Sequence, residues 1–255
     1  MSVETMDNKQ TETNIKPKGS RVANVFIFIG LMIVAQLPMI LALLTLGVAV
    51  ENENLSAIIG LGLGFVVLTG LVVWGIRTFY HKRSYENLNQ KIKKRDVGIN
   101  VLWFLVLRIL VVAFSVLMMN VYGEAQSEND EALMKSMENI EHLSAPIVIG
   151  LIIFFVAITF VAPYLEEHVF RGIFKETIFN KLALWSPLLI SSAIFSMNHA
   201  TSNIIGFLMY MSMGVIFYLA YRRRGDIKDS IMVHMINNAM AGIVVIASVI
   251  VAIYS

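Results

Sequence analysis

The stretch APIVIGLIIFFVAITFVAPYLEEHVFRGIF, residues 145–174, begins as an almost unbroken apolar run and ends with two adjacent carboxylates and an arginine. About 20 apolar residues in a helix are enough to cross the hydrocarbon core of a bilayer. The run therefore predicts a transmembrane helix. Its end raises a question, because Glu166, Glu167 and Arg171 are charged residues in a place where apolar residues should continue.

The composition of the whole chain supports a membrane protein. Of 255 residues, 57% are hydrophobic and only 15% are charged, and the mean hydropathy is +0.71, well outside the usual range of soluble domains. The absence of cysteine excludes a disulfide framework, a thiolate metal site and a cysteine nucleophile. A net charge of +2 without a separate basic domain gives no sign of a nucleic-acid partner.

Apolar segments of suitable length recur along the chain and predict an all-α fold, a polytopic transmembrane helical bundle of about seven spans. The fourth segment is long for one crossing, so we expect it to be tilted, kinked or partly emergent. The expected spans are 22–50, 55–80, 97–121, 145–179, 186–200, 203–221 and 230–254.

The placement of charge divides the chain into three parts and predicts its orientation. Residues 1–21 form a polar tail, residues 22–143 hold the first three spans with a basic linker and an acidic loop, and residues 144–255 hold the other four spans. Lysine and arginine concentrate in cytoplasmic loops of membrane proteins. We therefore expect a multi-pass protein of the cell membrane, with the tail and basic linker in the cytoplasm and the acidic loop and C-terminus outside.

The charged residues at the end of the fourth span need compensation, since an ionisable side chain inside a bilayer costs about 2.5–3.5 kcal/mol. Glu167 and Arg171 are four residues apart and share one helical face, which favours an ion pair. Glu166 lies about 100° around the helix and lacks that partner. The alternative is that all three snorkel at the membrane surface. Arg108, midway along the third span, is interpreted as a snorkelling or paired residue, with a functional role as the alternative.

Two later spans carry histidines in regular polar patterns. FSMNH, residues 195–199, places Phe195 and His199 on one helical face, and HMINN, residues 234–238, does the same for His234 and Asn238. Two histidines, a glutamate and an asparagine on three apolar spans are hard to explain by packing alone. They predict a polar site inside the bundle.

In this order the motifs Glu-Glu-x-x-x-Arg at 166–171, Phe-x-x-x-His at 195–199 and His-x-x-x-Asn at 234–238 resemble the CAAX proteases and bacteriocin-processing enzymes, which include the Abi proteins. The resemblance covers residues 145–254. It implies a membrane-embedded endopeptidase whose catalytic core is 144–255 and whose site opens toward the cytosol. It also implies roles in peptide processing or bacteriocin immunity, with membrane lipids and a peptide or protein substrate as partners.

The residues themselves suggest how a peptide bond would be hydrolysed. A carboxylate in apolar surroundings is a stronger base than one in water, so we assign Glu166 as the base that activates water. His199 would hold the water or pass a proton. His234 and Asn238 would donate to the oxyanion, while the Glu167–Arg171 pair would fix the helix.

A second mechanism uses zinc. His199, His234 and Glu166 would supply three ligands and leave one tetrahedral position open, with Glu167 as the base. The sequence has no HExxH motif. Zinc and a metal-free glutamate mechanism therefore both stay open.

Two other classes of protein fit the same residues in part. A proton-coupled transporter also buries such groups but should show repeated halves, which the sequence lacks, and a catalytically silent immunity or scaffold protein would keep the fold. The depth of the site poses a further difficulty. His199 lies about 20 Å into its span from the cytosolic end, whereas His234 lies near the cytosolic end of its own, so we place the site in the cytosolic half and expect tilted or sunken helices.

Overall fold

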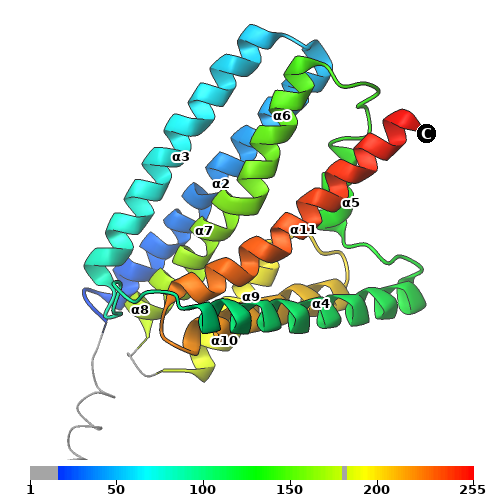
Figure 1. Cartoon of the computed structure of the whole chain (residues 1–255). Helices are drawn as coiled ribbons and strands as arrows, with labels where there is room; N and C mark the ends of the chain where they lie inside the picture. Colours follow the sequence, from blue (N-terminus) through cyan, green and yellow to red (C-terminus); the bar gives the residue numbers. More distant parts are fainter. Residues whose placement is uncertain (1–16, 180–182) are drawn as a thin grey trace, which may run out of the picture.

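The computed structural model describes residues 17–179 and 183–255, and within these ranges the regular structure is helical throughout (Figure 1). Most of the predicted tail, residues 1–16, lies outside the described residues. Besides the fourth span, the helices are α2 (Arg21–Asn52), α3 (Leu55–Arg83), α4 (Lys94–Tyr122), α5 (Glu128–Lys135), α9 (Trp185–Met197), α10 (Ile204–Arg222) and α11 (Ile227–Tyr254).

The predicted fourth span is one continuous helical segment with two π-helical stretches. Six helices of the described chain, this segment among them, are long and apolar enough to cross a membrane, and α9 is a shorter apolar helix. The all-α prediction of about seven spans is thus confirmed. The fourth segment consists of α6 (Ala145–Val156), η1 (Ala157–Val161), α7 (Ala162–Glu167), η2 (His168–Ile173) and α8 (Phe174–Ile178).

Short polar side chains mark where several helices begin. The side-chain oxygens of Asn54, Ser127 and Asn203 accept hydrogen bonds from backbone N–H groups three residues later, over 3.1, 3.2 and 2.8 Å respectively. Such caps satisfy donors that the first helical turn leaves unpaired. These caps set the starts of α3, α5 and α10.

The helices cross one another in two main directions. In Figure 1, α2, α3 and the fourth segment run side by side, α4 and α10 run across them, and α11 passes obliquely between the two groups. A single buried cluster includes Phe28, Tyr80, Val169, Phe217 and Val233. Residues of the first three spans and of the last four therefore share one hydrophobic core.

The basic linker after α3 is held against the bundle. Lys228 donates through Nζ to the carbonyl of Gln90 over 2.6 Å, and the hydroxyls of Tyr80 and Tyr221 donate to the carboxylate of Glu86. Burial, together with the nearby charge of Glu176, raises the pKa of Glu86 to about 7. The linker therefore carries a carboxyl group that titrates near neutral pH.

Candidate active site

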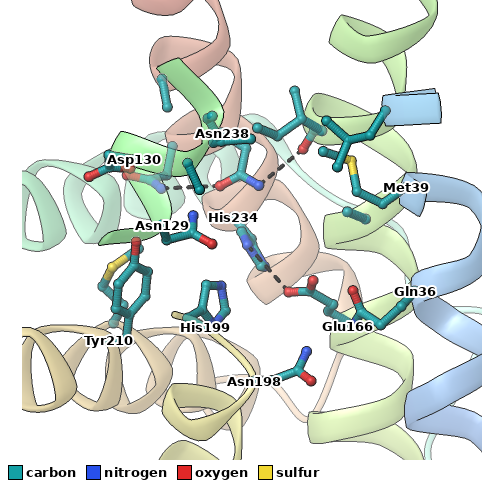
Figure 2. A pocket seen from close by; sticks show the side chains of 18 of the residues that line it. Gln36, Met39, Asn129, Asp130, Glu166, Asn198, His199, Tyr210, His234 and Asn238 are labelled. Carbon is teal, nitrogen blue, oxygen red and sulfur yellow. Dashed lines mark hydrogen bonds and ion pairs between the residues drawn. The ribbon is translucent and has the colours of Figure 1, made fainter. Parts of the chain in front are cut away.

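A cavity of about 510 Å³ lies where α2, α4, α5, α7, α10 and α11 meet the end of α9. Four of the six predicted site residues line it: Glu166, His199, His234 and Asn238. Figure 2 shows them converging from three helical segments. Tilted or sunken helices were expected to bring His199 and His234 together. In the structure both line the cavity, where α9 is short and α10 lies across the direction of the fourth segment (Figure 1).

Glu167 and Arg171 lie behind this cavity and form the predicted pair. Nη1 of Arg171 is 3.2 Å from Oε1 of Glu167, and neither side chain is exposed to solvent. The guanidinium also donates from Nη2 to the carbonyl of Gly214 over 3.2 Å. It lies 4.5 Å from the ring centre of Phe195 and 5.4 Å from that of Phe217. Ion pairing, a hydrogen bond and cation–π contacts together compensate the buried charge.

The pair also orients His234. Nδ1 of His234 is 2.9 Å from the same Oε1 of Glu167, and its ring stacks on Phe217 with centroids 4.3 Å apart. A carboxylate only accepts hydrogen bonds, so Nδ1 carries the proton and donates it. The other ring nitrogen, Nε2, then faces Glu166, whose Oε2 is 3.9 Å away.

This geometry refines the predicted role of His234. In the neutral ring with the proton on Nδ1, Nε2 is an acceptor. Donation to an oxyanion therefore requires the protonated imidazolium. The gap of 3.9 Å to Glu166 is too long for a hydrogen bond, but an atom in the cavity can contact both groups.

His199 is held in a comparable way. Its Nδ1 is 2.8 Å from the carbonyl oxygen of Phe195, so Nδ1 donates and Nε2 is left as an acceptor. The ring stacks on Tyr210 with centroids 4.3 Å apart, and the hydroxyl of Tyr210 is 2.9 Å from that of Ser127. His199 is therefore held with Nε2 available as a hydrogen-bond acceptor.

Asn238 serves the architecture of the site. Within the π-helical turn η1, the backbone N–H of Ala162 bonds to the carbonyl of Ala157, five residues earlier. In that register the carbonyl of Ile158 should accept from residue 163, but Pro163 has no N–H. The side-chain amide of Asn238 donates to this carbonyl over 3.0 Å instead. The predicted oxyanion donor thus has one of its two N–H bonds committed to the fourth segment.

The acidic loop between the third and fourth spans, called the acidic connection below, unexpectedly forms one wall of the cavity. Asn129 and Asp130 of α5 line the cavity, and Figure 2 shows them near Asn238 and Tyr210. This connection is the one predicted to face outward. If this connection faces outward, the cavity extends toward the outer side beyond the cytosolic half in which the site was expected.

Tyr210, Asn129 and Asp130 line the cavity but are not among the residues predicted for the site. Tyr210 is a single tyrosine in an apolar helix, and Asn129 and Asp130 lie in a charged loop. Nothing in the spacing of these residues separates them from membrane-anchoring or solvated positions. His168 points elsewhere, since its Nδ1 contacts the carbonyl of Tyr164 and its ring packs against Tyr80.

The side chains do not gather as a metal site. In the part of the chain that the structure describes, no three histidine, cysteine, aspartate or glutamate side chains come together in a way that could hold a metal ion. Glu167 is already committed to Arg171 and His234. The residues proposed for zinc, His199, His234 and Glu166, therefore do not fit the closely spaced ligand set of a catalytic zinc ion.

The fold and the cavity together define a multi-pass helical membrane protein with a buried glutamate–histidine site. Residues 148–240 match the protein family described as type II CAAX prenyl endopeptidase Rce1-like. This match covers all three motifs and confirms the resemblance to the CAAX protease family.

Two curated relatives support the same conclusion. The chain is 31% identical over 153 residues to a protein named membrane-embedded CAAX protease MroQ, from Staphylococcus aureus, and 29% identical over 152 residues to one named putative membrane peptidase YdiL, from Bacillus subtilis. Each match covers 57% of this chain and 57% of the relative, so the chain spans little more than half the length of either. No solved structure gives a significant match.

Proposed function

We propose that this protein is an intramembrane endopeptidase in which Glu166 activates the attacking water. The observation that carries the proposal is the convergence of Glu166, His199 and His234 on one cavity. A buried Glu167–Arg171 pair behind them fixes His234. The family and the names of the relatives support a peptidase as the class of enzyme.

The first chemical step uses Glu166 and His199. Glu166 takes a proton from a water molecule in the cavity, and the water oxygen attacks the carbonyl carbon of the substrate. Nε2 of His199 accepts the second hydrogen of the same water and orients it. Because Phe195 and Tyr210 fix the His199 ring, little reorganisation is needed when the water reacts.

The second step breaks the carbon–nitrogen bond. The tetrahedral oxyanion accepts a hydrogen bond from Nε2–H of His234, which enters and leaves the reaction as the imidazolium and donates from Nδ1 to the Glu167 carboxylate. Asn198 also lines the cavity, and among the described residues its side-chain amide has no hydrogen-bond partner, so it is a further donor. Glu166 then gives its proton to the leaving nitrogen, which restores the carboxylate.

The substrate in this proposal is a membrane-associated peptide or protein, and the cellular role is peptide processing or bacteriocin immunity. The protein lies in the cell membrane with its N-terminus in the cytoplasm and its C-terminus outside. Lipid contact is supported by apolar faces that are exposed on the long helices, such as Phe26, Trp74 and Ile109.

Glu166→Gln tests the proposal, because it keeps the volume of the side chain while removing the base. The purified variant in liposomes, given a pool of quenched fluorescent peptides of defined sequence, should lose nearly all cleavage seen with the wild type. Removing a general base typically lowers rates by about 10²–10⁴-fold. The variant should accumulate in membranes and unfold at a temperature close to that of the wild type.

Glu128→Gln is the matched control, since it makes the same chemical change at an exposed position of α5. It should cleave like the wild type. Cleavage at the wild-type rate by Glu166→Gln, or no cleavage of any peptide by the wild type, would contradict the proposal.

A further inference from the structure

Arg108 is a charged residue of the cavity that the proposed mechanism does not use. It lies midway along α4, an apolar helix long enough to cross a membrane, and it is half-buried and lines the cavity. A cation at such a depth is costly unless it is paired or faces a polar cavity. Arg108 meets the second condition, and the cavity that it lines gives an anionic ligand access to its guanidinium.

The described part of the chain does not supply an anionic partner at contact distance. Nη1 of Arg108 donates to Oδ1 of Asn237 over 3.3 Å, but no carboxylate of a described residue lies within 4.0 Å of the guanidinium. Arg171 differs, because it has Glu167 at 3.2 Å. Of these two arginines, Arg171 has its structural counter-ion and Arg108 has an amide oxygen.

Asp130 is the carboxylate that acts on Arg108 through space, from α5 across the cavity. It is engaged by its own helix cap, because Ser127 donates to its Oδ2 over 2.8 Å. The negative charge of Asp130 therefore partly offsets the positive charge of Arg108, although the two side chains do not form an ion pair.

Arg108 is also close to the reacting groups. Its partner Asn237 lies three residues after His234, which corresponds to about 4.5 Å along α11. An extended peptide advances about 3.3 Å per residue. On this spacing, a carboxylate bound at Arg108 would belong to a residue about one or two positions from the bond that faces Glu166.

We propose that Arg108 is the anchor for a carboxylate of the substrate, either its C-terminal carboxylate or the side chain of an aspartate or glutamate near the scissile bond. The inference rests on the proposed peptidase function and adds the chemical class that the cavity selects. The guanidinium fork matches a carboxylate in two parallel hydrogen bonds.

Binding to the Glu166→Gln protein tests the anchor without requiring turnover. Short fluorescein-labelled peptides of alanine and leucine would be compared as matched pairs. In the first pair, one peptide ends in a carboxylate and the other in a carboxamide. In the second pair, both C-termini are amidated, and one peptide contains an aspartate where the other contains an asparagine. Fluorescence anisotropy in detergent gives the dissociation constant of each peptide, and the two pairs distinguish the two sources of the carboxylate.

At least one acidic peptide should bind about tenfold or more tightly than its neutral twin, as expected for a charge-assisted hydrogen bond. Adding Arg108→Gln should abolish this preference, and Arg108→Lys should retain part of it. Asp130→Asn should strengthen the preference, because it removes the competing negative charge. Arg77→Gln, at an exposed arginine on α3, is the control and should leave the preference unchanged.

Three outcomes would contradict the proposal that Arg108 binds a substrate carboxylate. The acidic and neutral peptides of both pairs could bind equally, the preference for the acidic peptide could survive Arg108→Gln, or no peptide could bind. A purely structural role for Arg108, through Asn237, would lower the unfolding temperature of Arg108→Gln but weaken both twins alike. Failure of the peptidase proposal looks different, since the wild type would then cleave nothing while the charge preference of the Glu166→Gln protein persisted.

Discussion

Nδ1 of His234 and Oε1 of Glu167 lie 2.9 Å apart, and the same oxygen faces Arg171 at 3.2 Å. One carboxylate oxygen therefore links the buried arginine to the imidazole that faces the cavity. Glu166, the preceding residue, lines the cavity. The adjacent glutamates of the motif thus have different surroundings and, in our proposal, different tasks.

The buried pair predicts a specific pattern of stability. Arg171→Ala leaves Glu167 buried without its cation, and breaking a buried pair on one side costs about 3–5 kcal/mol. The unfolding temperature of the purified protein in detergent should fall markedly. Replacing Glu167 with Gln in the same background should recover part of the loss, because the unpaired charge is gone. Arg95→Ala, at an exposed position, is the control, and a similar loss in that variant would refute the explanation.

The contact between Asn238 and the Ile158 carbonyl predicts a rescue. Asn238→Leu removes the donor at similar volume and should cost about 1–3 kcal/mol of stability, since a buried carbonyl loses its partner. Pro163→Ala in that background restores a backbone N–H at the position that the π register requires. The double variant should be more stable than Asn238→Leu alone in thermal unfolding. If Pro163→Ala lowers stability further instead, the carbonyl is not what Asn238 satisfies.

Membrane orientation can be tested directly because the chain has no cysteine. Single cysteines at Asn89 in the basic linker and Glu131 in α5 both replace exposed side chains. In intact cells a membrane-impermeant thiol reagent should label the cysteine at position 131 and spare the one at position 89. Both should react once the membrane is permeabilised. Labelling at 89 but not at 131 in intact cells would reverse the proposed orientation.

Glu86 predicts how stability depends on pH. Its folded pKa is raised to about 7 by burial and by Glu176, whereas an unfolded glutamate titrates near pH 4.3, roughly. The folded state binds more protons between these values. The stabilising contribution is therefore complete below about pH 4.3 and is lost as the pH rises through about 7, with a total on the order of 3 kcal/mol.

Thermal unfolding in detergent at about pH 5 and pH 8 measures this contribution. Glu86→Gln should reduce the difference in unfolding temperature between the two conditions, because the titrating group is removed. Glu124→Gln, at an exposed glutamate of the acidic connection, should keep the wild-type difference. An unchanged difference in Glu86→Gln would assign the pH dependence to other groups.

The arrangement of ligands predicts that peptide cleavage does not need zinc. Protein purified through a strong chelator, with its metal content measured by mass spectrometry, should retain its rate of peptide cleavage. If instead the active protein carries about one equivalent of zinc and loses activity on its removal, Glu166, His199 and His234 must rearrange to bind it.

Much of the fold could be predicted because it depends on local sequence. Segment length and hydropathy locate the spans, and the four-residue spacing of Glu167 and Arg171 predicts their pair, which is seen at 3.2 Å. The motif spacings also predict a polar site that contains His199 and His234, both of which line the cavity, although the meeting of the two depends on how α9 and α10 pack. These features need only helical periodicity and the cost of a charge in a bilayer.

The remaining features depend on contacts between distant segments. The π-helical turn before Pro163 becomes favourable because Asn238, far along the chain, supplies the missing donor. The stacking of Tyr210 on His199 and its contact with Ser127 likewise join separate segments. The periodicity of a single sequence shows which residues share a helical face. It does not show which residues of two distant segments contact each other.

The two π-helical stretches, η1 and η2, lie on either side of α7 and of Glu166. A π turn arises when a helix holds one residue more than the α register needs, so each stretch is equivalent to a single-residue insertion. Losing that residue would convert the π turn into an ordinary α-helical turn, while the turns on either side kept the faces that they present. A one-residue gap that a sequence alignment places within 157–161 or 168–173 would therefore mark the loss of a π turn in a relative whose flanking turns still align, and should not be closed as an alignment error.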